Sequence, residues 1–205
     1  MRPSCLVLEC EQTEGGHTIL LRSPALGRRV DAIPMHELGR ADLSRYRGLL
    51  LGLHCDQRHL AARREQLEAY LAGGGTIVFC GHLAYPFVTG MERYRVIPNY
   101  RVDDLRVRKE RPHAVWEGVA EDDMTFRRGV AGFYGRGHNP PPAGAEVINT
   151  LGPARVPVDW EWRPRAGGRV LVHAGADLWM YLETEGTAAR LAPQLLDWID
   201  AGSAA

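Results

Sequence analysis

Residues 48–80 contain two apolar runs separated by a segment with helical periodicity. The first run, 48–54, is almost uninterrupted, which is typical of a strand covered on both faces. In 59–72, leucines recur at helical spacing while charged residues occupy the other face. Three glycines at 73–75 end this helix, because glycine tolerates the left-handed cap, and the second run, 76–80, follows. The pattern predicts two parallel strands joined by a right-handed crossover.

Further elements are expected on the same grounds. Strands are predicted at 5–10, 28–34 and 168–174, with less regular candidates at 145–151 and 156–162 and a strand or a hairpin over 96–109. A helix with inward leucines is predicted over 186–201, and 135–144 is a loop rich in glycine and proline. No internal repeat or low-complexity linker interrupts the chain. We therefore expect one α/β domain over 1–205, with a mainly parallel sheet and extra β elements in the second half.

The charge balance gives no reason to expect nucleic acid or an anionic membrane as a partner. Lys and Arg number 25, Asp and Glu also number 25, and the formal net charge is zero. No apolar stretch approaches the roughly 20 residues of a membrane-spanning helix, and the apolar start is short for a signal peptide. Four cysteines without a CxxC motif are typical of a reduced, intracellular protein. We expect a cytoplasmic protein with a small-molecule ligand, and homo-oligomerisation as a generic property.

Histidines, cysteines and carboxylates gather where the predicted strands end. In open parallel sheets, ligands bind outside the carboxyl ends of the strands. The residues at these positions are Glu9 after the first strand, His54 and Cys55 after the third, Cys80, Gly81 and His82 after the fourth, and His173 and Asp177 after the last. His138, in the glycine- and proline-rich loop, can reach over the same edge. These residues are the candidate site.

Two of these segments resemble a known family. The strand that ends in Cys80-Gly81-His82 is similar to the cysteine-bearing turn of class I glutamine amidotransferases, and 169–173 matches the strand before their histidine. The glycines at 73–75 and the segment Gly168-Arg169-Val170 are similar to the ThuA-like branch of the same superfamily. The resemblance implies a flavodoxin-like, class I glutamine amidotransferase-like three-layer sandwich.

The resemblance also implies roles for three residues. Cys80 would be the nucleophile, because a neighbouring imidazole lowers the pKa of a thiol and produces the reactive thiolate. His173 would supply that imidazole, and Asp177 or Glu9 would fix its tautomer. The sequence departs from the family at two places: His82 stands where the turn has a glycine, and Gly175 stands where the acidic residue follows the histidine.

Three interpretations of function remain open from the sequence. The first is an amidotransferase-like domain that binds a small polar metabolite and hydrolyses it through Cys80 and His173. The second is a non-catalytic, ThuA-like binding or scaffold module in which Cys80 is a core residue, as free cysteines often are. The third is a metal-dependent enzyme that uses His54, His82 and His173, since zinc accepts such ligands. No cofactor is expected, and no metal in the first two interpretations.

Overall fold

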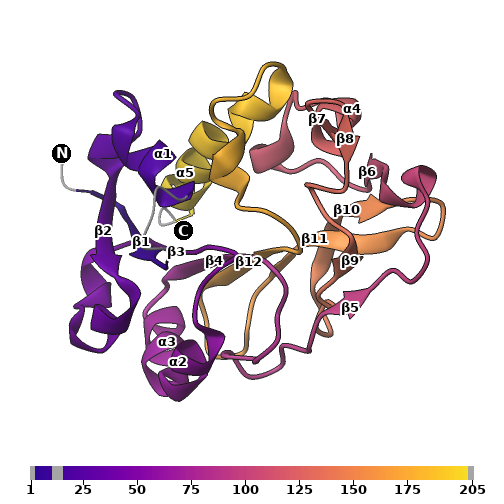
Figure 1. Cartoon of the computed structure of the whole chain (residues 1–205). Coiled ribbons are helices and arrows are strands. Elements are labelled where there is room, and N and C mark those ends of the chain that lie inside the picture. Colours follow the sequence, from indigo (N-terminus) through magenta and orange to yellow (C-terminus); the bar gives the residue numbers. More distant parts are fainter. Residues whose placement is uncertain (1–2, 11–15, 203–205) are drawn as a thin grey trace.

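The computed structural model describes residues 3–10 and 16–202 and is organised around one eight-stranded sheet (Figure 1). Across the sheet, the strands are β2 (Val30–Pro34), β1 (Cys5–Glu9), β3 (Gly48–Leu51), β4 (Thr76–Cys80), β12 (Arg169–His173), β11 (Val156–Trp162), β10 (Glu146–Leu151) and β6 (Val107–Lys109). Two small sheets pair β5 (Arg95–Val96) with β9 (Gly137–His138) and β7 (Phe126–Arg127) with β8 (Val130–Ala131).

The helices complete the chain. The α-helices are α1 (Gly16–Arg22), α2 (Gln57–Ala62), α3 (Arg64–Ala72), α4 (Glu121–Thr125) and α5 (Leu191–Ala201). The 3-10 helices are η1 (Gly27–Arg29), η2 (Met35–Arg40), η3 (Leu43–Arg45), η4 (Val102–Leu105), η5 (Ala114–Trp116), η6 (Leu178–Tyr181) and η7 (Thr187–Arg190). Within the described part of the chain, none of these helices has the length and apolarity that a membrane crossing requires.

Five strands, β2-β1-β3-β4-β12, pair in parallel and form the first half of the sheet. This order is that of flavodoxin-like sheets, so the predicted α/β class, its mainly parallel sheet and the crossover within 48–80 are confirmed. The crossover helix differs in detail, because it is divided at Arg63 into α2 and α3. Asp56 is the N-cap of α2, and its carboxylate accepts hydrogen bonds from the N–H groups of Arg58 and His59 at 3.0 and 3.1 Å.

The second half of the sheet is antiparallel. β12 pairs with β11, β11 with β10, and β10 with β6, so the extra β elements extend the parallel half along one edge. The prediction of a strand or a hairpin over 96–109 is wrong, because β5 pairs with β9 and β6 with β10. Between β5 and β6, η4 intervenes, and the carboxylate of Asp104 accepts a hydrogen bond from the N–H of Arg101 at 2.8 Å. The last α-helix begins at Leu191 rather than at 186, because 187–190 forms a 3-10 turn after Gly186, whose φ is +94°.

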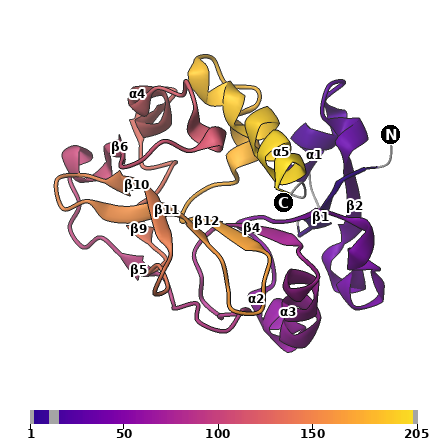
Figure 2. The same ribbon diagram turned by 180° about the vertical axis from the view of Figure 1, so that it is seen from behind.

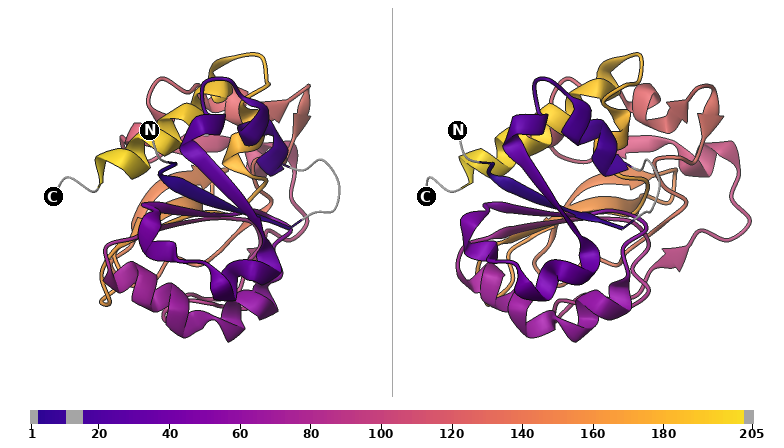
Figure 3. Two further views of the ribbon diagram at one scale, coloured as in Figure 1. Left: turned by 90° about the vertical axis from the view of Figure 1, so that its left-hand side faces the viewer. Right: turned by 60° about the vertical axis from the view of Figure 1, so that its left-hand side comes forward.

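Helices cover both faces of the sheet, and the sheet divides the core into two layers (Figures 1 and 2). α1 and α5 lie on one face, and α2 and α3 on the other; Figure 3 shows the sheet between them. Side chains alternate along each strand, so Val7 and Leu50 pack in the α5 layer while Leu8 and Leu51 pack in the α3 layer. The same alternation decides which layer receives each residue at the strand ends.

Candidate functional site

Cys80 and His173 are neighbours across β4 and β12. They are register partners in the parallel ladder, which continues past them because the Gly81 N–H donates to the His173 carbonyl at 2.9 Å. Cys80 belongs to the α5 layer, and His173 shares that face because it lies two residues after Leu171. The structure thus brings together the two segments that the sequence singled out.

The thiol of Cys80 is enclosed by the core. Cys80 is the last residue of β4 and has no exposed surface. Burial raises the pKa of this thiol well above its ordinary value, and the negative charge of Asp177 raises it further. A thiol in this environment stays protonated and is inaccessible to a dissolved substrate. Cys80 therefore has the surroundings of a structural cysteine.

The carboxylate beside His173 is Asp159, from the neighbouring antiparallel strand β11. The His173 Nδ1–H donates to Asp159 Oδ1 at 2.6 Å, and both side chains are fully buried. Asp177, which the family resemblance placed in this role, instead accepts a hydrogen bond from the Leu53 N–H at 2.7 Å. His173 Nε2 is buried and has no hydrogen-bond partner among the described residues.

Asp159 is the centre of a buried polar network. Its Oδ2 accepts hydrogen bonds from Tyr134 Oη at 2.7 Å and from Asn149 Nδ2 at 2.8 Å. Tyr134 in turn accepts a hydrogen bond from Trp116 Nε1 at 2.5 Å. Burial and the Asp159 charge raise the pKa of the Tyr134 phenol, so it remains a donor. These donors offset the cost of burying a carboxylate, which indicates a structural network.

Sequence reasoning missed Asp159, Tyr134 and Asn149. One signal was available for Asp159: it stands between Val158 and Trp160 in a strand pattern. A carboxylate inside a buried strand needs buried donors. The sequence does not identify those donors, because they come from three other segments.

Asp177 helps to form a small crevice at the carboxyl ends of β1 and β3. After β1, the chain adds β2 on one side of that strand and β3 on the other. The topological switch point therefore lies between β1 and β3, which is where flavodoxin-like sheets bind ligands. The crevice is lined by Val7, Leu8, Cys10, His17, Gly52, His54, Asp177 and Trp179. Its volume is about 10 Å³, which is about the space of one water molecule. The indole N–H of Trp179 is buried and finds no acceptor within the described parts of the chain.

A second polar group lies beyond β4. The His82 ring stacks on the Tyr94 ring with centroids 4.0 Å apart and an interplanar angle of 22°. Partial desolvation lowers the pKa of His82 and of His138, so both imidazoles are neutral at pH 7. Desolvation also raises the pKa of Tyr94 to about 12. Neither Tyr94 Oη nor His138 Nδ1, both buried, has a hydrogen-bond partner in residues 3–10 and 16–202.

The remaining candidates are divided between these places. Glu9 is half-buried at the end of β1. Cys55 is buried in the α3 layer, where burial raises the pKa of its thiol. Gly81, with a φ of +133°, lies where an added Cβ would come within 3.0 Å of Leu53 Cα, and its carbonyl accepts a hydrogen bond from Asn139. Over the described ranges, no three His, Cys, Asp or Glu side chains are placed to hold a metal ion.

No family model matches the sequence, and no curated protein matches it. Among solved structures, the chain is similar to Gan42B, a GH42 beta-galactosidase, with a TM-score of 0.52 and 14% sequence identity. A catalytic mutant of Gan42B from G. stearothermophilus has a TM-score of 0.45 and 12% identity. Each alignment covers 98% of this chain and 30% of the other chain, so this chain spans less than a third of the enzyme's length. At this identity, the likeness to Gan42B concerns the fold alone.

Proposed function

We propose that this chain is a non-catalytic binding domain that takes a small polar ligand at the carboxyl ends of its parallel strands. The observation that carries the proposal is the complete burial of the Cys80 thiol. Cysteine catalysis needs an accessible thiolate, whereas burial keeps this thiol protonated. We infer that the polar groups beside the carboxyl ends of these strands serve in binding.

The position of Cys80 within β4 explains why its thiol is buried. A catalytic cysteine at a sharp turn stands beyond the last ladder pair, where its side chain is free of the sheet. Cys80 still pairs with His173, so the alternation of the strand directs its thiol into the α5 layer. The turn comes one residue later, at Gly81.

The crevice between β1 and β3 has polar side chains in its lining that a ligand could contact. Asp177 and His54 line this space, and so does Trp179, whose buried indole N–H has no acceptor among the described residues. Because the volume is that of about one water molecule, only a single polar group, such as a hydroxyl or an amide, enters it. The rest of the ligand would lie outside this edge of the sheet.

The family resemblance belongs to the same proposal. We assign the chain to the class I glutamine amidotransferase-like superfamily and, within it, to the ThuA-like branch, which generally lacks a cysteine nucleophile. The parallel order β2-β1-β3-β4-β12 and the glycines at 73–75 support this assignment.

The test follows the Trp179 indole signal by NMR while L-glutamine or D-galactose is added to about 50 mM, a range that detects millimolar affinity. We expect a saturable shift with at least one probe. The shift persists in Cys80→Ala, weakens in His54→Gln at the crevice, and is unchanged in the control His36→Gln, an exposed histidine on η2. Release of ammonia from L-glutamine that is lost in Cys80→Ala refutes the non-catalytic role. Absence of a shift with both probes refutes the crevice as the site.

A further inference from the structure

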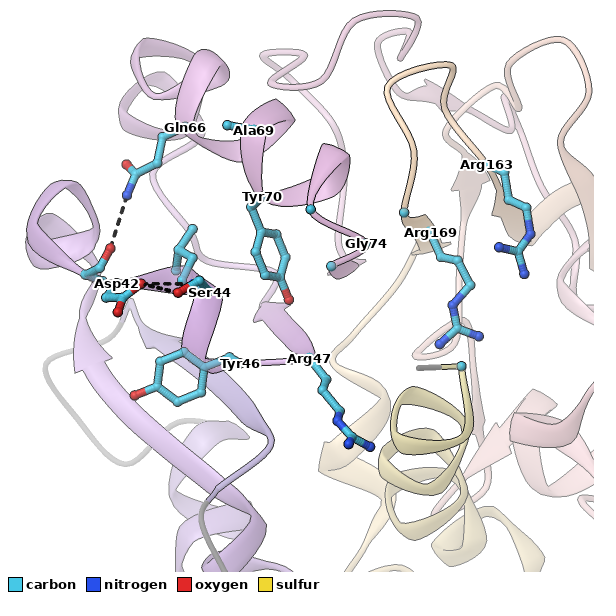
Figure 4. Close-up of a pocket in the computed structure, with 16 residues that line it drawn as sticks. Asp42, Ser44, Tyr46, Arg47, Gln66, Ala69, Tyr70, Gly74, Arg163 and Arg169 are labelled. Atoms are coloured by element: carbon cyan, nitrogen blue, oxygen red, sulfur yellow. Dashed lines mark hydrogen bonds between the residues drawn. The ribbon is translucent and has the colours of Figure 1, made fainter. Parts of the chain in front are cut away.

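A cavity of about 700 Å³ lies at the opposite ends of the parallel strands, beside the amino ends of β3, β4 and β12 (Figure 4). Residues from 41–47, 66–75 and 163–169, together with Gly202, contribute to its walls. We call this cavity the arginine groove. Its volume falls within the range of small-molecule sites in proteins. It is separate from the carboxyl edge to which the proposed function refers.

The arginine groove has a local excess of positive charge. Arg47, Arg163 and Arg169 line it, and Asp42 is the one carboxylate among its lining residues in the described chain. Asp42 is already engaged, because it accepts hydrogen bonds from the N–H and hydroxyl of Ser44 at 3.2 and 2.6 Å. The whole chain has a net charge of zero, so this excess is a property of the groove.

Arg169 is a buried cation whose hydrogen-bond acceptors are all neutral. Only 7% of its surface is exposed. Its guanidinium lies 4.0 Å from the Trp198 ring centroid, and Nη2 donates to Thr76 Oγ1 and to the Trp198 and Ile199 carbonyls at 3.2–3.4 Å. Within 3–10 and 16–202, Nε and Nη1 make no hydrogen bond. The charge of Glu161 acts on this guanidinium through space, but Glu161 makes no hydrogen bond with it. The donors that remain give Arg169 capacity for an anion.

The other two arginines keep their donors accessible. Arg47 is exposed, and its Nη1 donates to the Asp200 carbonyl at 3.1 Å. The Arg163 side chain is 71% exposed, and its Nη2 forms a long ion pair with Glu161 Oε1 at 3.8 Å. In Figure 4, Arg47 and Arg169 extend toward the C-terminal end of α5. Two segments distant in sequence, 41–47 and 163–169, thus deliver three guanidinium groups to one cavity.

We propose that the arginine groove binds a small-molecule oxyanion, either a phosphate or a carboxylate group, through Arg47, Arg163 and Arg169. The planar fork of a guanidinium matches both anions and can donate two parallel hydrogen bonds to either. Arg169 provides the fixed, partly desolvated contact at the groove wall. Arg47 and Arg163 contact the anion from the solvent-exposed side of the groove.

The experiment titrates the full chain with inorganic phosphate or with succinate, each against chloride at matched ionic strength, because screening weakens exposed contacts. Intrinsic tryptophan fluorescence follows binding, since the ring of Trp198, one of the five tryptophans, contacts Arg169. The variants are Arg47→Gln and Arg163→Gln. The matched control is Arg165→Gln, an exposed arginine two residues from Arg163 that does not line the groove. The substituted arginines are exposed, and circular dichroism confirms that each variant is folded.

We expect saturable binding of at least one probe, weakened about tenfold in Arg47→Gln and in Arg163→Gln but unchanged in Arg165→Gln. Binding of phosphate alone assigns a phosphate group, and binding of succinate alone assigns a carboxylate. The proposal is overturned if neither probe binds at about 20 mM, a concentration that reveals millimolar affinity. It is overturned equally if all three variants bind like the parent or lose affinity to the same extent.

Discussion

Replacing Tyr134 by Phe removes one hydroxyl from the centre of the buried network without changing the ring. That hydroxyl donates to Asp159 at 2.7 Å and accepts from the Trp116 indole at 2.5 Å. The substitution therefore removes a hydrogen bond to a buried carboxylate and also leaves an indole N–H without its acceptor. Tyr134 is 1% exposed, so water does not replace either contact in the folded chain.

The loss of these two hydrogen bonds determines how far the free energy of unfolding falls in Tyr134→Phe. A hydrogen bond to a charged group contributes about 1.5–3 kcal/mol, and a buried donor left unsatisfied costs about 1–3 kcal/mol. Because the two contacts share one atom, the losses are not fully additive, and we expect the free energy of unfolding to fall by about 2–4 kcal/mol. For a chain of this length, such a loss lowers the Tm by roughly 5–15 °C.

Tyr181→Phe is the matched control. The Tyr181 ring is also buried, but its hydroxyl has no hydrogen-bond partner in the part of the chain that the structure describes. Its removal should change the stability by less than about 0.5 kcal/mol or increase it. Urea unfolding followed by tryptophan fluorescence measures both variants. Equal losses in Tyr134→Phe and Tyr181→Phe would refute the network as a source of stability.

Two further predictions concern acid stability and packing. Hydrogen bonds from the Thr187 hydroxyl and N–H hold the pKa of Asp123 below its ordinary 3.8, so the stability that Asp123 contributes is present above that pH and lost as the pH falls below it. In Asp123→Asn, the loss of stability between about pH 5 and pH 3, measured by urea unfolding, should be smaller than in the parent. An added Cβ at Gly175 would lie 1.7 Å from the Tyr134 carbonyl, whereas at Gly73 the nearest atom is 3.5 Å away. Gly175→Ala should therefore cost about 1–3 kcal/mol and Gly73→Ala much less; similar unfolding midpoints for the two would contradict this packing.

The parallel half of the fold could be predicted because its information is local. The apolar runs at 48–54 and 76–80 and the helical pattern between them each indicate one element, and chain connectivity then determines their pairing. The first residue of α5 was harder to predict from the sequence. Pro193 is tolerated in the first turn of a helix, and the apolar pattern continued back through η7, so the pattern alone did not locate Leu191 as the first residue.

For the candidate site, the sequence predicted which residues lie at the ends of the strands but not where their side chains point or what they contact. The sequence places Cys80 and His173 at one edge of the sheet, but whether a thiol lies in the core or on a turn depends on where the ladder stops. The partner of His173 depended on tertiary pairing, because Asp159 belongs to an antiparallel strand added beside β12. The arginine groove was missed because its three guanidinium groups come from segments with no shared sequence pattern.

The most direct test of the non-catalytic role is the alkylation rate of Cys80 with iodoacetamide, followed by mass spectrometry of the native chain and of the same chain in urea. We predict that native Cys80 reacts at least about a thousandfold more slowly than in the unfolded chain, because modification requires opening of the core. Native Cys80 reacting faster than unfolded Cys80 would demonstrate an accessible, activated thiolate and would contradict the account.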